Sequence, residues 1–135
     1  MSGTAREAGL ASQAAVRARD KEAWLALFAP DGVVEDPVGP SGFDPEGKGH
    51  HGPEAIAAFW DKAIAPTDAI EFHFGDSFAC GNEIAFTGLI RSTLGGHVID
   101  AEGVFTYRVD AEGRIAALRA FWEVDRAMQT ARPAV

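Results

Sequence analysis

The segment VVEDPVG, from Val33 to Gly39, places two carboxylates directly before a proline and directly after two valines. The valines predict a β-strand, because β-branched side chains are enriched in strands. Asp36, at the end of that strand, has two interpretations. An Asp-Pro pair commonly begins a turn, so Asp36 could be a turn residue. At the rim of an apolar pocket it could instead be a general base, which needs walls that exclude water and a donor for the charge it creates.

Two helices are expected before this strand. Thr4-x-x-Glu7 is a capping-box pattern, and the apolar residues that follow it near helical spacing predict a first helix to about Arg19. Asp20 caps a second, shorter helix with the sequence KEAWLALFA. The turn residues Pro30-Asp31-Gly32 are expected to end this helix.

The chain after the strand divides into a loop, a helix and a set of strands. The glycine- and proline-rich interval Pro37–Gly52 predicts a long surface loop, and loops of this length are often functional. Pro53 begins a third amphipathic helix, which ends before Pro66. Beyond Pro66 the apolar residues alternate, which predicts an antiparallel meander with hairpin turns at Gly95-Gly96 and Ala111–Gly113. We therefore expect an α+β fold, and a sheet curled around the helices would leave a pocket.

Composition and charge exclude several classes of protein. A chain of 135 residues, 47% of them hydrophobic, has the size of one domain, and we expect a single domain over 1–135. Twelve basic against twenty acidic residues, without any Lys/Arg run, exclude a nucleic-acid partner. The lone Cys80, in an apolar setting, is expected in the core, and a chain without a disulfide suits a reducing compartment. No membrane-length apolar run or signal peptide is evident, so we expect a cytoplasmic protein without a membrane partner.

Two motifs suggest ligands that their context does not support. Gly47–Gly52 spells the dinucleotide pattern G-x-G-x-x-G, but no strand leads into it and no βαβ unit surrounds it. A nucleotide site is therefore not expected. The histidines are divided between one loop and separate strands, so we expect surface positions, no metal site and no cofactor: His50, His51, His73 and His97.

Aromatic residues are the remaining candidates for pocket walls. At helix and strand spacing they are more often core residues than ligand contacts, so both interpretations stay open on composition alone. They are Phe59, Trp60, Phe86, Phe105, Tyr107 and Trp122.

Four segments of the chain resemble the steroid Δ5-isomerases, or ketosteroid isomerases, of the nuclear transport factor 2-like, polyketide-cyclase-like superfamily. They read ALFAPDGVVEDPVG, GPEAIAAFWDKAI, NEIAFTG and GRIAALRAFW, and EDPVG is the most specific piece. The likeness covers most of the chain in order, with Gly39–Gly52 as an insertion. It implies a cone-shaped barrel in which a curved antiparallel or mixed sheet wraps around three N-terminal helices.

The resemblance also assigns positions in the site. In the family an Asp base works beside an oxyanion hole made of a tyrosine and a protonated aspartic acid. The base falls on Asp36. The pocket walls fall on Phe59, Trp60, Phe86, Leu118 and Trp122.

Both oxyanion donors of the family are replaced in this sequence. Counting without gaps places Ser12 at the position of the tyrosine and Phe105 at that of the protonated acid. Tyr107 lies on the same strand face as Phe105, and the indole N–H groups of Trp60 and Trp122 are donors too. Substitutes for the lost donors are therefore conceivable.

The resemblance implies binding of a small apolar carbonyl compound, steroid-like or polyketide-like. Asp36 would take a proton from a carbon next to the carbonyl and return it elsewhere on the dienolate. Loss of one oxyanion donor costs about 2.7–4 kcal/mol in the barrier. We therefore expect isomerase activity that is weak or directed to another substrate.

Three alternatives stay open. The same fold carries polyketide cyclases and epoxide hydrolases. A hydrolase would need an arginine between two acids, whereas Arg91, Arg108 and Arg119 are expected as solvated charges. The third alternative is a binding protein without catalysis.

We also expect a homodimer, because the curled sheet would leave an outer face uncovered. The strand alternation places three residues on this face: Leu89, Val104 and Thr106.

Overall fold

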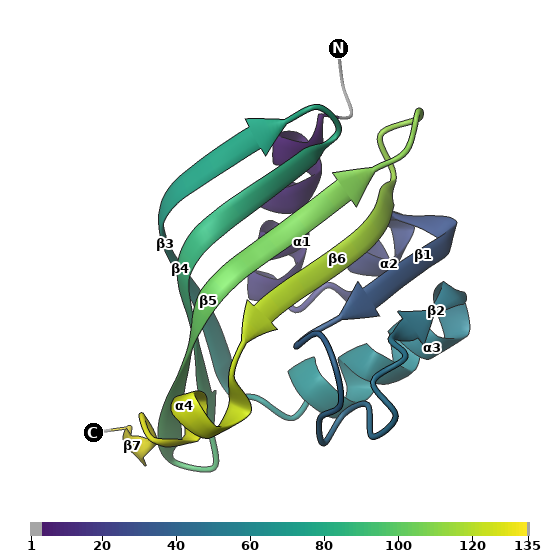
Figure 1. Ribbon diagram of the computed structural model, residues 1–135. Coiled ribbons are helices and arrows are strands. Elements are labelled where there is room, and N and C mark those ends of the chain that lie inside the picture. Colours follow the sequence, from purple (N-terminus) through teal and green to yellow (C-terminus); the bar gives the residue numbers. More distant parts are fainter. Residues whose placement is uncertain (1–3, 135) are drawn as a thin grey trace.

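The structure, a computed structural model, describes residues 4–134 and confirms the α+β prediction: one curved mixed sheet lies against the helices (Figure 1). The sheet is open rather than closed into a barrel. None of the helices between residues 4 and 134 has the length and apolar character needed to cross a membrane. The elements are α1 (Ala5–Arg17), α2 (Lys21–Ala26), β1 (Phe28–Glu35), β2 (His50–His51), α3 (Gly52–Phe59), the π-helical turn η1 (Trp60–Ile64), β3 (Ala69–Cys80), β4 (Glu83–Leu94), β5 (His97–Val109), β6 (Ile115–Trp122), α4 (Val124–Met128) and β7 (Arg132–Pro133).

The strand order is β2-β1-β6-β5-β4-β3, and β7 pairs with the start of β5. Strands β1 and β6 are parallel, and every other pair is antiparallel. Leu94 pairs with His97, which confirms the predicted turn at Gly95-Gly96. The parallel pair brings the end of β1 beside β6, although the two strands are far apart in the sequence. This pairing determines where Asp36 lies.

The predicted second helix is too long. Helix α2 ends at Ala26, and Phe28 begins β1 instead of continuing the helix. Pro30-Asp31-Gly32 therefore lie within an irregular part of β1, where the register with β6 shifts between Phe28 and Val33. A proline is tolerated at such an irregularity because its missing N–H leaves no ladder bond unmade. Pairing with β6 outweighs the local turn preference of these residues.

Helix α1 begins as the sequence predicts and rests closely on the sheet. The Thr4 side chain accepts a hydrogen bond from the Glu7 backbone N–H, and the Glu7 side chain accepts one from Thr4 in return. Gly9 allows the close approach, since a Cβ there would lie 2.8 Å from Phe86 Cε2 and 2.9 Å from Tyr107 Cδ1. The helix turn after Gly9 thus lies directly over β4 and β5.

Two glycines allow the sheet to bend. Gly88 of β4 and Gly103 of β5 are direct partners, and Gly88 has a φ of +144°. A Cβ at Gly88 would overlap the carbonyl oxygen of His73, and a Cβ at Gly103 would overlap that of Phe121. Close backbone approach at glycine is one of the means by which sheets curve. Figure 1 shows β3, β4 and β5 curving around the helices.

The core lies between the helices and the concave face of the sheet. Trp24 is 1% exposed, and its ring centroid lies 4.8 Å from that of Phe28 and 5.3 Å from that of Trp60. Cys80 corrects the sequence prediction, because it is exposed at the end of β3 rather than buried.

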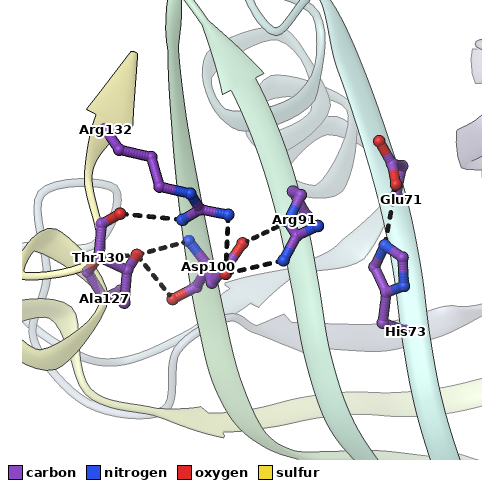
Figure 2. A network of polar contacts seen from close by, with 7 residues as sticks. All are labelled: Glu71, His73, Arg91, Asp100, Ala127, Thr130 and Arg132. Carbon is purple, nitrogen blue, oxygen red and sulfur yellow. Dashed lines mark hydrogen bonds and ion pairs between the residues drawn. The ribbon is translucent and has the colours of Figure 1, made fainter. Parts of the chain in front are cut away.

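A polar network fastens the C-terminal segment to the sheet (Figure 2). The Asp100 carboxylate accepts hydrogen bonds from Arg91 Nε at 2.8 Å and Nη2 at 3.1 Å, and it pairs with Arg132 Nη2 at 3.2 Å. The Asp100 backbone N–H donates to Thr130 Oγ1 at 2.8 Å. The hydrogen bond from Arg91 is the main cause that lowers the pKa of Asp100. The segment after β6 is thereby fixed beside the β4–β5 hairpin.

The two bending glycines generate a stability prediction. Gly88→Ala or Gly103→Ala should each lower the free energy of unfolding by about 1–3 kcal/mol, because the backbone must move to admit a Cβ. Gly75→Ala is the control, since a Cβ there meets nothing within 4 Å and should change stability by no more than about 0.5 kcal/mol. Urea unfolding followed by circular dichroism measures all three. Equal stabilities for the three variants would refute the assigned role of Gly88 and Gly103.

Candidate functional site

A cavity of about 340 Å³ lies between the concave face of the sheet and the helices. Its size and apolar walls are typical of small-molecule sites. Among the described residues that line it, Asp36 is the only one with a charged side chain. Seven of the residues selected from the sequence line this cavity: Ser12, Asp36, Phe59, Phe105, Tyr107, Leu118 and Trp122.

Two of the selected residues are not among those that line the cavity. Trp60 is 4% exposed and packs on Trp24 in the core. Phe86 stacks on Phe74 at 5.4 Å and meets Tyr107 edge-on at 5.8 Å. Both residues pack against side chains that line the cavity, Trp60 against Trp24 and Phe86 against Tyr107. The indole N–H of Trp60 therefore does not face a ligand in the cavity.

Several lining residues were missed by the sequence selection. The sheet contributes alternate residues of three strands, which the period of two could have identified: Ile70, Phe72, Ile90, Ser92, Ile99 and Ala101. Val124 and Met128 of α4 lie four residues apart, which is helical spacing. Phe43 gave no signal, because it lies in a loop without periodicity.

The two carboxylates of VVEDPVG separate onto opposite sides of the chain. Glu35 accepts a hydrogen bond from Arg119 Nε at 2.7 Å, whereas Asp36 lines the cavity. Alternation along a strand explains the difference, because successive side chains point to opposite faces. The Val38 backbone N–H donates to the Ala120 carbonyl at 2.9 Å, which keeps the chain beyond Asp36 beside β6. Asp36 is thus a cavity residue rather than only a turn residue.

Trp122 holds the Asp36 carboxylate. Its indole Nε1–H donates to Asp36 Oδ1 at 2.6 Å. Burial raises the pKa of Asp36, and the hydrogen bond from Trp122 acts against burial by stabilising the charged form. A carboxylate with a raised pKa and a fixed orientation is suited to accept a proton from a bound molecule.

A second polar group lies on the α1 side of the cavity. Ser12 is 2% exposed and its Oγ accepts a hydrogen bond from Trp24 Nε1 at 3.0 Å. Burial raises the pKa of Tyr107 to about 12, with smaller opposing contributions from hydrogen bonds of Gln13 and Ser12. The charge of Asp36 also raises the pKa of Tyr107.

The arginines do not join Asp36. Arg91 is bound to Asp100 and Arg119 to Glu35, and Arg108 is exposed. None of the three lines the cavity. An arginine placed between two acids, as the hydrolase alternative requires, is not found among the described residues of this site.

The glycine-rich loop is organised by Asp44. The Asp44 carboxylate accepts backbone N–H bonds from Gly47 at 3.1 Å, Lys48 at 3.3 Å and Gly49 at 2.7 Å. These bonds lower the pKa of Asp44, and they occupy the amides that a phosphate would need. The loop also carries Phe43 to the cavity, where its ring meets Phe59 at 6.1 Å.

Comparison with solved structures gives close matches over nearly the whole chain. RV0760c from Mycobacterium tuberculosis is 36% identical with a TM-score of 0.87, over 98% of this chain and 97% of that chain. The Δ5-3-ketosteroid isomerase from Mycobacterium sp. is 37% identical with a TM-score of 0.84, over 95% of this chain and 96% of that chain. RV0760c in complex with estradiol-17β-hemisuccinate gives 37% identity and a TM-score of 0.84, over 95% and 97% of the two chains.

Comparison by sequence identifies the domain. No curated protein matches the chain. Residues 11–118 match the family model described as the SnoaL-like domain. The chain therefore belongs to the SnoaL-like domain family and is a ketosteroid-isomerase-like member of the nuclear transport factor 2-like superfamily.

Proposed function

We propose that the cavity binds a steroid-like or polyketide-like carbonyl compound and that Asp36 moves a proton next to its carbonyl group. The observation that carries this proposal is the placement of one carboxylate, held by Trp122 at 2.6 Å, among otherwise uncharged walls. The relatives support the ligand class, since one is a ketosteroid isomerase and another is bound to estradiol-17β-hemisuccinate.

The proton transfer follows from the properties of Asp36. The carboxylate takes a proton from the carbon beside the carbonyl, and the electron pair of that C–H bond delocalises to the carbonyl oxygen as a dienolate. The protonated Asp36 then returns the proton to another carbon of the dienolate, so the double bond moves without net oxidation. A raised pKa brings the basicity of Asp36 closer to that of such a substrate.

The charge on the dienolate oxygen limits the rate. Phe105 offers no donor, and the Ser12 hydroxyl is engaged within the protein, because it accepts from Trp24 and hydrogen-bonds to Tyr107. Each missing oxyanion donor costs about 2.7–4 kcal/mol in the barrier. We therefore expect slow isomerisation of steroids, and the same observation favours a binding protein without catalysis as the second candidate.

The first test separates an enzyme from a binding protein. Asp36→Asn should lower turnover of a 3-oxo-Δ5-steroid by at least about 100-fold, because general bases contribute that much. The affinity for estradiol-17β-hemisuccinate should stay within about threefold. The control is Glu35→Gln, which removes the neighbouring carboxylate on the other face and should leave turnover unchanged. A parent protein that binds but shows no turnover would establish the binding protein instead.

The second test concerns the pH dependence of Asp36. Activity requires the deprotonated carboxylate, so turnover should fall as the pH drops through its raised pKa. Trp122→Phe removes the hydrogen bond that stabilises the charged form, so the pKa should rise further and the acid limb should move to higher pH. Trp60→Phe, which changes a tryptophan outside the cavity, is the control. Carbon NMR titration of the Asp36 carboxyl measures the same pKa without turnover, and an unchanged value in Trp122→Phe would contradict the assignment.

The third test concerns a homodimer, which we propose to form through the outer face of the sheet. Val104 is 38% exposed and pairs directly with Phe121, which is 44% exposed. Burying such residues against a second copy is favourable. Sedimentation at micromolar concentration should give twice the chain mass of 14.3 kDa, and Val104→Glu should shift it to the monomer. The exposed Leu10 of α1 provides the control Leu10→Glu, and a monomeric parent would refute the proposal.

A further inference from the structure

The donors that face the cavity can be assigned by elimination. The Trp122 indole donates to Asp36 at 2.6 Å, and the Trp24 indole donates to Ser12 at 3.0 Å. The Thr67 hydroxyl donates to the Ile64 carbonyl at 2.6 Å. Three of the polar groups that line the cavity are therefore already committed to protein acceptors.

The Ser12 hydroxyl accepts from Trp24 and also hydrogen-bonds to Tyr107, so it is engaged within the protein as well. Among the described residues that line the cavity, Ser92 and Tyr107 remain with a hydroxyl available to a ligand. Ser92 lies on β4 two residues before Leu94, which is 47% exposed, and is therefore near the open end of the cavity. Tyr107 is 4% exposed and lies on the inner part of β5, opposite Leu118 of β6. Of these two, Tyr107 is the one buried deep in the wall, next to Ser12 and Gln13 of α1.

The tyrosine ring is held on several sides. Gly9 of α1 lies against one edge of the ring, and Phe86 packs on it edge-on at 5.8 Å. The ring therefore has little room to rotate. Gln13, one residue after Ser12 on α1, is 4% exposed, and its side chain lies beside Tyr107, whose pKa it lowers. A polar cluster of Ser12, Gln13 and Tyr107 thus stands beside the cavity.

We propose that the Tyr107 hydroxyl donates to the carbonyl or phenol oxygen of the bound compound and is the group that stabilises its charge. This inference rests on the proposed function and adds the residue that orients the ligand. The donor thus lies on β5, two residues after Phe105, and not at the position of Ser12 on α1. With one donor in place of two, the protein retains a defined carbonyl position and a reduced rate.

The ionisation of Tyr107 is consistent with this role. With a pKa of about 12, its hydroxyl stays protonated throughout the physiological range and remains a donor. The hydrogen bonds of Ser12 and Gln13 lower that pKa, so they favour charge on the tyrosine oxygen and make it a better donor.

The test removes the Tyr107 hydroxyl by substitution and the phenol oxygen of the ligand by use of a 3-deoxy analogue. Estradiol-17β-hemisuccinate and its 3-deoxy analogue are titrated against the parent and Tyr107→Phe, with tryptophan fluorescence as the readout. The variant should bind the phenol at least about tenfold more weakly, which corresponds to about 1.4 kcal/mol. Its affinity for the 3-deoxy analogue should stay within about twofold. Turnover of a 3-oxo-Δ5-steroid by the variant should fall at least about tenfold.

Controls separate this inference from the proposed function. Thr106→Val removes a hydroxyl from the neighbouring outward position of β5 and should change neither affinity. The inference would be overturned if Ser92→Ala, and not Tyr107→Phe, removed the difference in affinity between estradiol-17β-hemisuccinate and its 3-deoxy analogue. Equal effects of Tyr107→Phe on the affinities for both compounds would overturn it as well. A parent that binds neither compound would refute the proposed function and this inference together. Circular dichroism verifies the fold of each variant.

Discussion

The bend of the sheet at Gly88 and Gly103 is the constraint on which the remainder of the molecule depends. A flat sheet could cover the helices only with side chains packed directly against them, and no cavity would remain. The residue opposite Gly103 on β6 is Trp122, and the carbonyl of the preceding Phe121 occupies the place of the missing Cβ. The bend therefore also sets the position of the indole that holds Asp36. Sheet shape and site chemistry depend on the same few backbone contacts.

The electrostatics of the site follow from the separation of two adjacent acids. Glu35 finds Arg119 on the outer side, so its charge is paired and partly hydrated. No cationic side chain of residues 4–134 lines the cavity beside Asp36, which keeps one strong neutral donor, so its charged form is tolerated but not strongly stabilised. A lysine or arginine in place of the indole would lower the pKa and weaken the base. An apolar residue there would leave the carboxylate without a donor.

Much of the architecture could be predicted from the sequence, because it depends on local patterns. The capping box of α1, the alternation of the strands and the glycine turn between β4 and β5 each reflect neighbours in the chain. Asp36 and Trp122 were found through the EDPVG and RAFW segments of the family resemblance, since no local pattern places an indole beside a carboxylate. Phe28 was misassigned because its strand is created by pairing with β6, about ninety residues later in the sequence. The positions of the Trp60 and Phe43 side chains could not be predicted in the same way. The first depends on the rotation of a helix and the second on the path of a loop, and neither is recorded in the periodicity of the sequence.

The network around Asp100 connects the wall of the cavity to the C-terminal segment. Helix α4 supplies Val124 and Met128 to the cavity wall, and the segment that follows it is fastened through Thr130 and Arg132 to Asp100. A bound molecule that gains binding free energy from its contacts with α4 therefore stabilises the attached state of the C-terminal segment, and attachment strengthens its binding by the same factor. Binding in the cavity and the attachment of Thr130 and Arg132 to Asp100 are in this way thermodynamically linked.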